Sequence, residues 1–151
     1  MTLAIIIQAR MGSSRFPGKV MKDLAGRKVL SYSLERAKRI SQADVIVCAI
    51  PEESENDVLE DYAQTLGVKT TRGSQDDVLA RYYHAAKSVQ ADTIMRITSD
   101  CPVIEPEICD TVITKFIAEK ADYGCNNMPA SFPHGLDCEV FSFAWLERAF
   151  N

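Results

Sequence analysis

An apolar, largely β-branched run near the amino terminus stops abruptly at a loop rich in glycine, serine and basic residues. The run covers residues 3–9, and the cations of the loop are Arg10, Arg15 and Lys19. Such a continuous apolar run is typical of a strand that is buried on both faces of a parallel sheet. The sequence therefore predicts a central strand with a site for a polyanion at its carboxyl end.

The loop contains the residue types that bind phosphate, but not the spacing of the two standard phosphate loops. Gly12 and Gly18 let the backbone approach a ligand closely, and Ser13 and Ser14 add hydroxyl donors. Five residues separate the two glycines, whereas a P-loop has four, followed by lysine and a hydroxyl residue. A G-x-G-x-x-G motif is also absent. The predicted ligand is a nucleoside triphosphate held in another way, and the alternative is an exposed basic loop.

Strand-like apolar runs alternate with helical patterns along the chain. The expected strands are residues 3–9, 44–50, 68–71, 93–98 and 137–141, and the expected helices are residues 29–40, 56–66, 76–89, 106–119 and 144–150. This order predicts an α/β fold with a doubly wound, mainly parallel sheet. Ligands bind such sheets at the carboxyl ends of the strands. The loops after residues 9, 71 and 98 are therefore expected to share one site.

Composition limits the classes of partner. The 151 residues suit a single domain, and the net charge of −4 combines an acidic chain with a basic first quarter. That asymmetry fits a local anion site and argues against nucleic-acid binding. No apolar run approaches the roughly 20 residues needed to cross a bilayer, and no basic region precedes the first apolar run. Five cysteines without a C-x-x-C pair indicate reduced thiols, so we expect a cytoplasmic protein.

Asp100 is the candidate metal ligand. It follows the strand expected at residues 93–98 and precedes Cys101 and Pro102. A carboxylate at the end of a strand, facing a phosphate loop, suits Mg²⁺, which prefers oxygen ligands shared with substrate phosphates. The alternative role for this aspartate is the capping of a turn.

The start of the helix expected at residues 76–89 gives a weaker signal. Ser74 and the first amides of this helix are able to cap it or to bind an anion. Asp77 and Arg81 lie four residues apart, which favours an ion pair along the helix.

Four motifs, in order, resemble those of a known family. They are I-I-x-A-R-x-G-S-x-R-x-P-G-K at residues 6–19, R-G-S-x-x-D-V-L-x-R-Y at 72–82, R-x-T-x-D-C-P at 96–102 and P-x-G-L-D-x-E-V-F at 133–141. The chain resembles the cytidylyltransferases that make CMP-activated acidic sugars, such as CMP-KDO synthetases and acylneuraminate cytidylyltransferases. It is most similar to their SpsF-like branch, of spore coat polysaccharide biosynthesis.

This resemblance implies a Rossmann-like nucleotide-diphospho-sugar transferase fold and an Mg²⁺-dependent enzyme. The implied reaction transfers CMP from CTP to an acidic sugar and releases pyrophosphate, in polysaccharide or surface-glycan biosynthesis. A nucleotidyltransferase for another sugar or base is one alternative. The other is a non-catalytic nucleotide-binding or assembly module with the same fold.

The resemblance also assigns residues. Arg15, Lys19 and Asp100 are implied to be catalytic, with Asp100 as the metal ligand. The residues implied to bind the nucleotide are Ala9, Arg10, Gly12, Ser13, Ser14, Arg15, Lys19, Arg72 and Ser74. Those implied to bind the sugar are His134, Asp137 and Glu139. From its residue type alone, His134 is equally a loop histidine without a role.

The carboxyl-terminal helix raises an expectation about the length of the protein. It reaches Asn151 without a capping signal, and members of the resembled family supply a second metal-binding aspartate from a later segment. We therefore expect residues 1–151 to be one incomplete nucleotidyltransferase-like domain, part of a longer protein or completed by a partner chain. Trp145 and Phe150 are expected to be partly exposed and to favour self-association as a homodimer.

Overall fold

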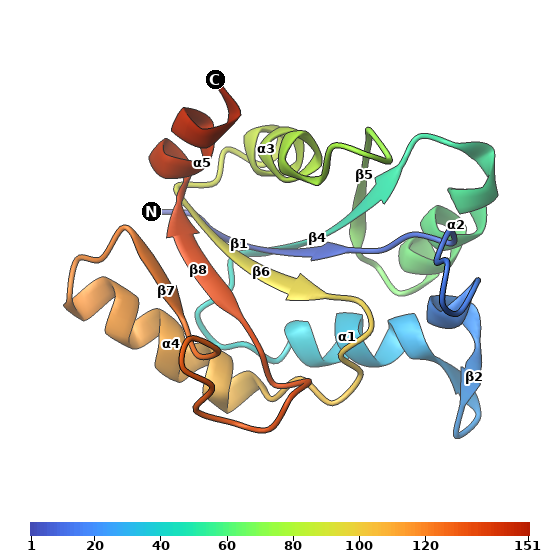
Figure 1. Cartoon of the computed structure of the whole chain (residues 1–151), viewed down its shortest axis with the longest axis horizontal. Coiled ribbons are helices and arrows are strands. Elements are labelled where there is room, and N and C mark those ends of the chain that lie inside the picture. Colours follow the sequence, from blue (N-terminus) through green and yellow to red (C-terminus); the bar gives the residue numbers. More distant parts are fainter.

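A six-stranded sheet forms the centre of the computed structural model, which describes all 151 residues (Figure 1). The strand order is β5-β4-β1-β6-β8-β7. In this order the strands are Lys69–Gly73, Val45–Pro51, Leu3–Gln8, Thr93–Thr98, Glu139–Ser142 and Tyr123–Cys125. The first four are parallel neighbours, whereas β8 runs antiparallel to both β6 and β7.

Helices cover both faces of this sheet (Figure 1). On one face lie α3 (Val78–Ser88) and α5 (Phe143–Phe150), and on the other lie α1 (Val29–Ala37), α2 (Asp57–Thr65) and α4 (Pro106–Ala118). The smaller elements are the 3₁₀ turns η1 (Lys19–Met21) and η2 (Ser54–Asn56) and a hairpin of β2 (Asp23–Leu24) and β3 (Arg27–Lys28). The expected α/β fold with a mainly parallel, doubly covered sheet is confirmed.

Strand β1 is the most deeply buried element. Ile5 and Ile7 belong to the core beneath α1, α2 and α4, whereas Ala4 and Ile6 belong to the core beneath α3 and α5. All four side chains are inaccessible to solvent. Because successive side chains of a strand point to opposite faces, only a strand covered on both faces accepts such a run.

The sequence pattern does not predict one edge of the sheet. Strand β7 has only three residues, too few to show an alternating pattern. Its central Gly124 packs so closely on β8 that a Cβ there would lie 3.3 Å from Cγ1 of Val140. The hairpin of β2 and β3 is also unpredicted, since each of its strands has two residues.

Helix α3 begins two residues later than expected, for a local reason. Asp77 Oδ1 accepts a hydrogen bond of 2.8 Å from the backbone N–H of Ala80 and caps the helix. The expected ion pair between Asp77 and Arg81 is therefore wrong. Arg81 instead turns toward the sheet, where its side chain is buried.

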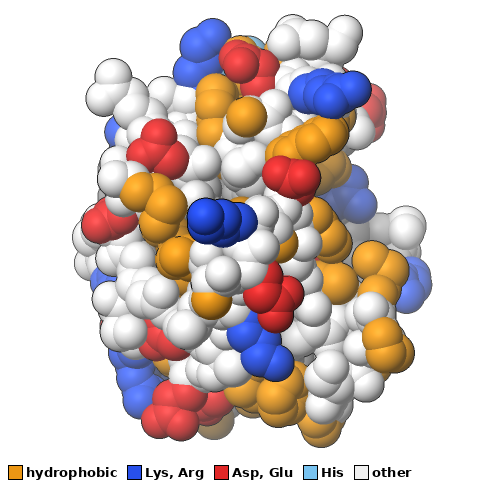
Figure 2. All heavy atoms as spheres, turned by 90° about the vertical axis from the view of Figure 1, so that its left-hand side faces the viewer, with side chains coloured by type: hydrophobic (Ala, Val, Ile, Leu, Met, Phe, Trp, Pro, Cys, Tyr) orange, Lys and Arg blue, Asp and Glu red, His pale blue; other side chains and the backbone are white.

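The face that carries β7, β8 and α5 shows apolar side chains interspersed with charged ones (Figure 2). Trp145 is 42% exposed and Phe150 is partly exposed, as expected. Self-association through this face stays a prediction. All five cysteines are free, and four of them are buried. None of the helices combines the length and the apolar character that crossing a bilayer requires.

The cap on α3 leads to a stability prediction. Replacing Asp77 with alanine removes the acceptor for the Ala80 N–H and should lower the free energy of unfolding by about 1 kcal/mol. Asp76→Ala is the matched control, because Asp76 is exposed and its side chain makes no hydrogen bond. Urea unfolding followed by circular dichroism measures both. Equal stabilities of the two variants would contradict the capping role.

Candidate functional site

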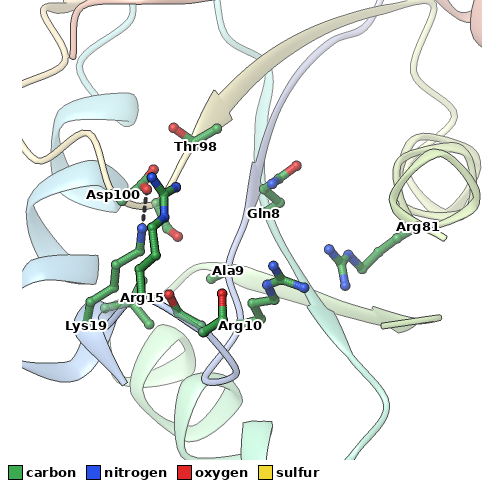
Figure 3. A pocket seen from close by; sticks show the side chains of 12 residues that line it. Gln8, Ala9, Arg10, Arg15, Lys19, Arg81, Thr98 and Asp100 are labelled. Carbon is green, nitrogen blue, oxygen red and sulfur yellow. Dashed lines mark hydrogen bonds and ion pairs between the residues drawn. The ribbon is translucent and has the colours of Figure 1, made fainter. Parts of the chain in front are cut away.

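A cavity of about 220 Å³ opens where the carboxyl ends of β1 and β6 meet the first turns of α3 (Figure 3). We call it the basic cavity, because four cationic side chains and one carboxylate line it. The cations are Arg10, Arg15, Lys19 and Arg81, and the carboxylate is Asp100. With this excess of positive charge, the cavity suits a ligand with several negative charges.

Most of the residues predicted from the amino-terminal loop meet in this cavity. Its lining includes Ala9, Arg10, Ser13, Ser14, Arg15 and Lys19. Gly12 lies outside the lining, where the loop passes close to the start of α2. A Cβ at Gly12 would lie 3.3 Å from Oε1 of the exposed Glu55, so a larger residue would require the Glu55 side chain to move slightly.

The backbone of the loop is held by its own turn and by a buried side chain. Gly18 adopts a left-handed conformation with φ of 66°, which glycine accepts without strain. Its N–H donates to the carbonyl of Met11 over 2.9 Å. The N–H of Met11 in turn donates to Oδ1 of Asn56 over 2.9 Å, and Asn56 is fully buried. The loop is therefore fixed without help from a ligand.

Asp100 lies on a second loop, whose backbone accepts hydrogen bonds from side chains of α1. The buried hydroxyl of Ser33 lies 3.1 Å from the carbonyl oxygen of Ser99 and 3.3 Å from that of Cys101. Arg36 donates from Nε to the carbonyl of Ile104 over 2.6 Å, further along the same loop. These bonds hold the backbone on both sides of Asp100.

Lys19 and Asp100 form an ion pair at one end of the basic cavity (Figure 3). Burial opposes ionisation of Asp100, but hydrogen bonding, chiefly from Lys19, outweighs it and holds the pKa of the carboxyl below its usual value. Asp100 is therefore ionised near neutral pH, and its side chain is still 44% exposed. A carboxylate in this state remains available to a cation brought by a ligand.

Arg81 closes the far end of the cavity, away from Lys19 and Asp100 (Figure 3). It is only 2% exposed, and no carboxylate pairs with it. Its Nη1 donates to the carbonyl of Ser74 over 3.1 Å, but its Nε has no partner. Burial lowers the pKa of Arg81, although an arginine stays charged in practice.

A second cavity of about 530 Å³ adjoins the basic cavity, and Arg15, Thr98 and Asp100 line both. We call it the neighbouring cavity. All three residues predicted to bind a sugar line it: His134, Asp137 and Glu139.

One ion pair and one contact between a histidine and a carboxylate organise the neighbouring cavity. Glu139 pairs with Arg96 over 2.6 Å, and Nδ1 of His134 lies 2.9 Å from Oδ2 of Asp137. The side chain of His134 is 99% exposed. Its ring is therefore held by one carboxylate and is otherwise free to contact a ligand.

Arg72 and Ser74 lie outside both linings. Arg72 donates from Nε to Glu60 over 2.9 Å and from Nη2 to Asp57 over 2.6 Å, and so ties β5 to α2. These hydrogen bonds raise the pKa of Arg72. Ser74 reaches the site only through its carbonyl, which accepts from Arg81. A direct role of either residue with a nucleotide stays a prediction.

Sequence reasoning missed six polar residues of the two cavities: Gln8, Arg81, Arg96, Thr98, Ser99 and Asn127. Gln8 is the only polar residue within β1, at the strand's carboxyl end. Arg96 interrupts the apolar pattern of β6 in the same way. Both residues could have been found from the sequence, because each is a polar residue inside an otherwise apolar strand. Arg81 could not have been found in this way, because Asp77, four residues earlier, offered an apparent ion-pair partner on the same helix.

Comparisons with known proteins identify the family of the chain. The profile of the family described as "Cytidylyltransferase" matches residues 4–132. An uncharacterised protein of Methanocaldococcus jannaschii is 37% identical over 146 residues, which are 97% of this chain and 59% of that protein. The spore coat polysaccharide biosynthesis protein SpsF of Bacillus subtilis is 33% identical over 125 residues, 80% of this chain and 52% of that protein.

A solved structure of a cytidylyltransferase from Leptospira borgpetersenii superposes with a TM-score of 0.93 at 36% identity. The match covers 98% of this chain and 63% of that one. The chain thus spans between half and three fifths of the length of the curated relatives named above. The resemblance drawn from the four motifs is confirmed, and the chain belongs to the cytidylyltransferase family.

Proposed function

We propose that the protein transfers CMP from CTP to a hydroxyl of an acidic sugar. The sugar oxygen attacks the α-phosphorus, the bond from this phosphorus to the β-phosphate bridging oxygen breaks, and pyrophosphate leaves while the hydroxyl proton passes to a base. The observation that carries this proposal is the wall shared by the two cavities. Arg15 and Asp100 border both, so a phosphate held between them would face a second substrate.

The basic cavity supplies the charge that nucleotidyl transfer requires. Arginine forks match phosphate oxygens, and lysine acts as a point charge. Lys19 and Arg15 lie at the end near the neighbouring cavity, so they would neutralise charge that builds up on the departing pyrophosphate. Catalysis then rests on positioning and electrostatics, without a covalent enzyme intermediate.

The neighbouring cavity supports a sugar acid as the acceptor. Arg15 and Arg96 offer cations to a carboxylate, and Asp137 and Glu139 offer acceptors to hydroxyl groups. His134 is oriented by Asp137 over 2.9 Å, an arrangement in which its other ring nitrogen would accept a proton from the attacking hydroxyl. The similarity to SpsF supports a role in polysaccharide biosynthesis.

Magnesium fits this site as a companion of the nucleotide. No group of three or more metal-ligating side chains exists in the structure, but Mg²⁺ usually binds through one or two carboxylates together with substrate phosphates. Asp100, ionised and partly exposed, meets this requirement. Bound there, Mg²⁺ would add positive charge to the phosphate oxygens. Lys19 would then exchange its contact with Asp100 for one with phosphate.

The deciding experiment incubates the protein with each of the four nucleoside triphosphates, Mg²⁺ and a panel of keto-sugar acids, and measures pyrophosphate release. Release with CTP and one sugar acid would support the proposal. Release with another base or a neutral sugar would favour a different nucleotidyltransferase. Nucleotide binding without release from any sugar would favour a non-catalytic binding module. Assembly as a homodimer is a further prediction, tested by light scattering.

Asp100→Asn is expected to abolish Mg²⁺-dependent pyrophosphate release while the protein stays folded. Asparagine keeps the shape of aspartate but lacks the charge that a hard cation requires. Asp61→Asn is the matched control, because Asp61 is an exposed residue of α2 with no side-chain hydrogen bond. Undiminished turnover in the Asp100 variant would rule out a metal-binding role.

Arg15→Ala and Lys19→Ala should each lower turnover by about 10²–10³-fold, the usual cost of losing one group that stabilises developing charge. Thermal stability should change little, since both side chains lie in a polar loop. Lys22→Ala serves as the control, because Lys22 is an exposed cation of the same segment outside the cavity. A large loss of stability with unchanged nucleotide affinity would make these residues structural.

A further inference from the structure

The two cavities of the site differ in the sign of their charge. The basic cavity has four cationic side chains and one carboxylate, whereas the neighbouring cavity has two arginines and three carboxylates. Arg15 and Asp100 belong to the shared wall, where the nucleotide and its Mg²⁺ would engage them. The remainder of the neighbouring cavity has one arginine, Arg96, and two carboxylates, Asp137 and Glu139. This part of the cavity therefore has an excess of negative charge.

Ion pairing leaves the charge of Asp137 uncompensated. Arg96 and Glu139 face each other on β6 and β8 and pair over 2.6 Å. No lysine or arginine pairs with Asp137, whose Oδ2 accepts from the N–H of Gly135 over 3.3 Å and lies 2.9 Å from Nδ1 of His134. His134 must be neutral to accept a proton, and its side chain is 99% exposed, so it compensates this carboxylate little.

The second oxygen of Asp137 is free to bind a ligand. Oδ1 takes part in no hydrogen bond within the protein, and it is accessible to solvent. The side chain as a whole is only 23% exposed. The backbone beside it is held in place, because the N–H of Cys138 donates to Oδ1 of the buried Asn126 over 3.0 Å. A fixed, partly buried carboxylate favours a cationic donor, since a hydrogen bond to a charged group is about twice as strong as one between neutral groups.

We propose that the acceptor is a zwitterion, a sugar acid with a protonated amine that binds Asp137, an inference that rests on the proposed function. In a 2-keto sugar acid the carboxylate is attached to the carbon whose hydroxyl attacks phosphorus, so it would lie at the shared wall, near Arg15. An amine elsewhere on the sugar would donate to Oδ1 of Asp137. Oε2 of Glu139, which accepts no hydrogen bond within the protein, is a second acceptor in the same cavity.

A hydroxyl is the competing partner of Asp137. It would satisfy the free oxygen but leave the negative charge of the carboxylate uncompensated. An acylated amine also donates one N–H without carrying a charge. The three groups therefore differ in charge at one position of the sugar, which makes charge the variable that the experiment changes.

The test measures kcat/KM by pyrophosphate release in the presence of CTP and Mg²⁺. The acceptors are octulosonic and nonulosonic acids, each prepared with a hydroxyl, a primary amine or an acetylated amine at the same carbon. Asp137→Asn removes the charge but keeps an oxygen that accepts from Gly135. Glu107→Gln is the control, because Glu107 is an exposed residue of α4 outside both cavities. Thermal unfolding of both variants accompanies the rates.

The native protein should use a primary-amine form about tenfold to a hundredfold more efficiently than its hydroxyl and acetylated forms, the usual value of a hydrogen bond to a charged group. Asp137→Asn should remove this preference, and Glu107→Gln should retain it. If Asp137→Asn fails to fold, the comparison of the three forms in the native protein decides.

Two outcomes would overturn the inference and leave the proposed function standing. One is equal or better use of the hydroxyl or acetylated forms by the native protein. The other is an equal loss of rate for all three forms in Asp137→Asn, which would show that Asp137 only positions His134. Binding of CTP without pyrophosphate release from any acceptor would instead remove the proposed function and the inference together.

Discussion

The burial of β1 on both faces is the constraint on which the rest of the structure depends. Its alternating side chains belong to two separate cores, one beneath α1, α2 and α4 and one beneath α3 and α5. A strand with no exposed face requires helical crossovers on both sides, and such crossovers make the neighbouring strands parallel. The carboxyl ends of β1 and β6 then lie together, and the loops that follow them form the site.

The acidic side chains of the protein do not neutralise the positive charge of the basic cavity. Four cations share the basic cavity with one carboxylate, although the chain as a whole carries a charge of −4. Elsewhere, arginines such as Arg36 and Arg72 pair with acidic side chains. Uncompensated like charges at close range destabilise a folded protein, and a bound polyanion removes this repulsion. The basic cavity differs from these sites because its four cations share a single carboxylate.

Local patterns predicted the strands β1 and β6, the basic loop and the position of Asp100, because each depends on neighbouring residues or on the rule for strand ends. The roles of Arg72 and Arg81 depend on distant contacts. Arg72 lies near the carboxyl end of β5, yet its fork binds acidic side chains 12 and 15 residues earlier in the chain. Arg81 has an acidic residue one turn away, yet Asp77 caps the helix instead. The antiparallel edge formed by β7 was also unpredictable, since a strand of three residues has no visible period.

Helix α1 connects the two halves of the site. The chain passes from the basic loop through η1 and the small hairpin directly into α1, and the same helix holds the loop of Asp100 through Ser33 and Arg36. Both charged loops are therefore attached to the same helix. The ion pair between Lys19 and Asp100 joins the two loops directly. A displacement of α1 would disturb both partners at once, which makes this helix the mechanical link between the basic loop and the loop of Asp100.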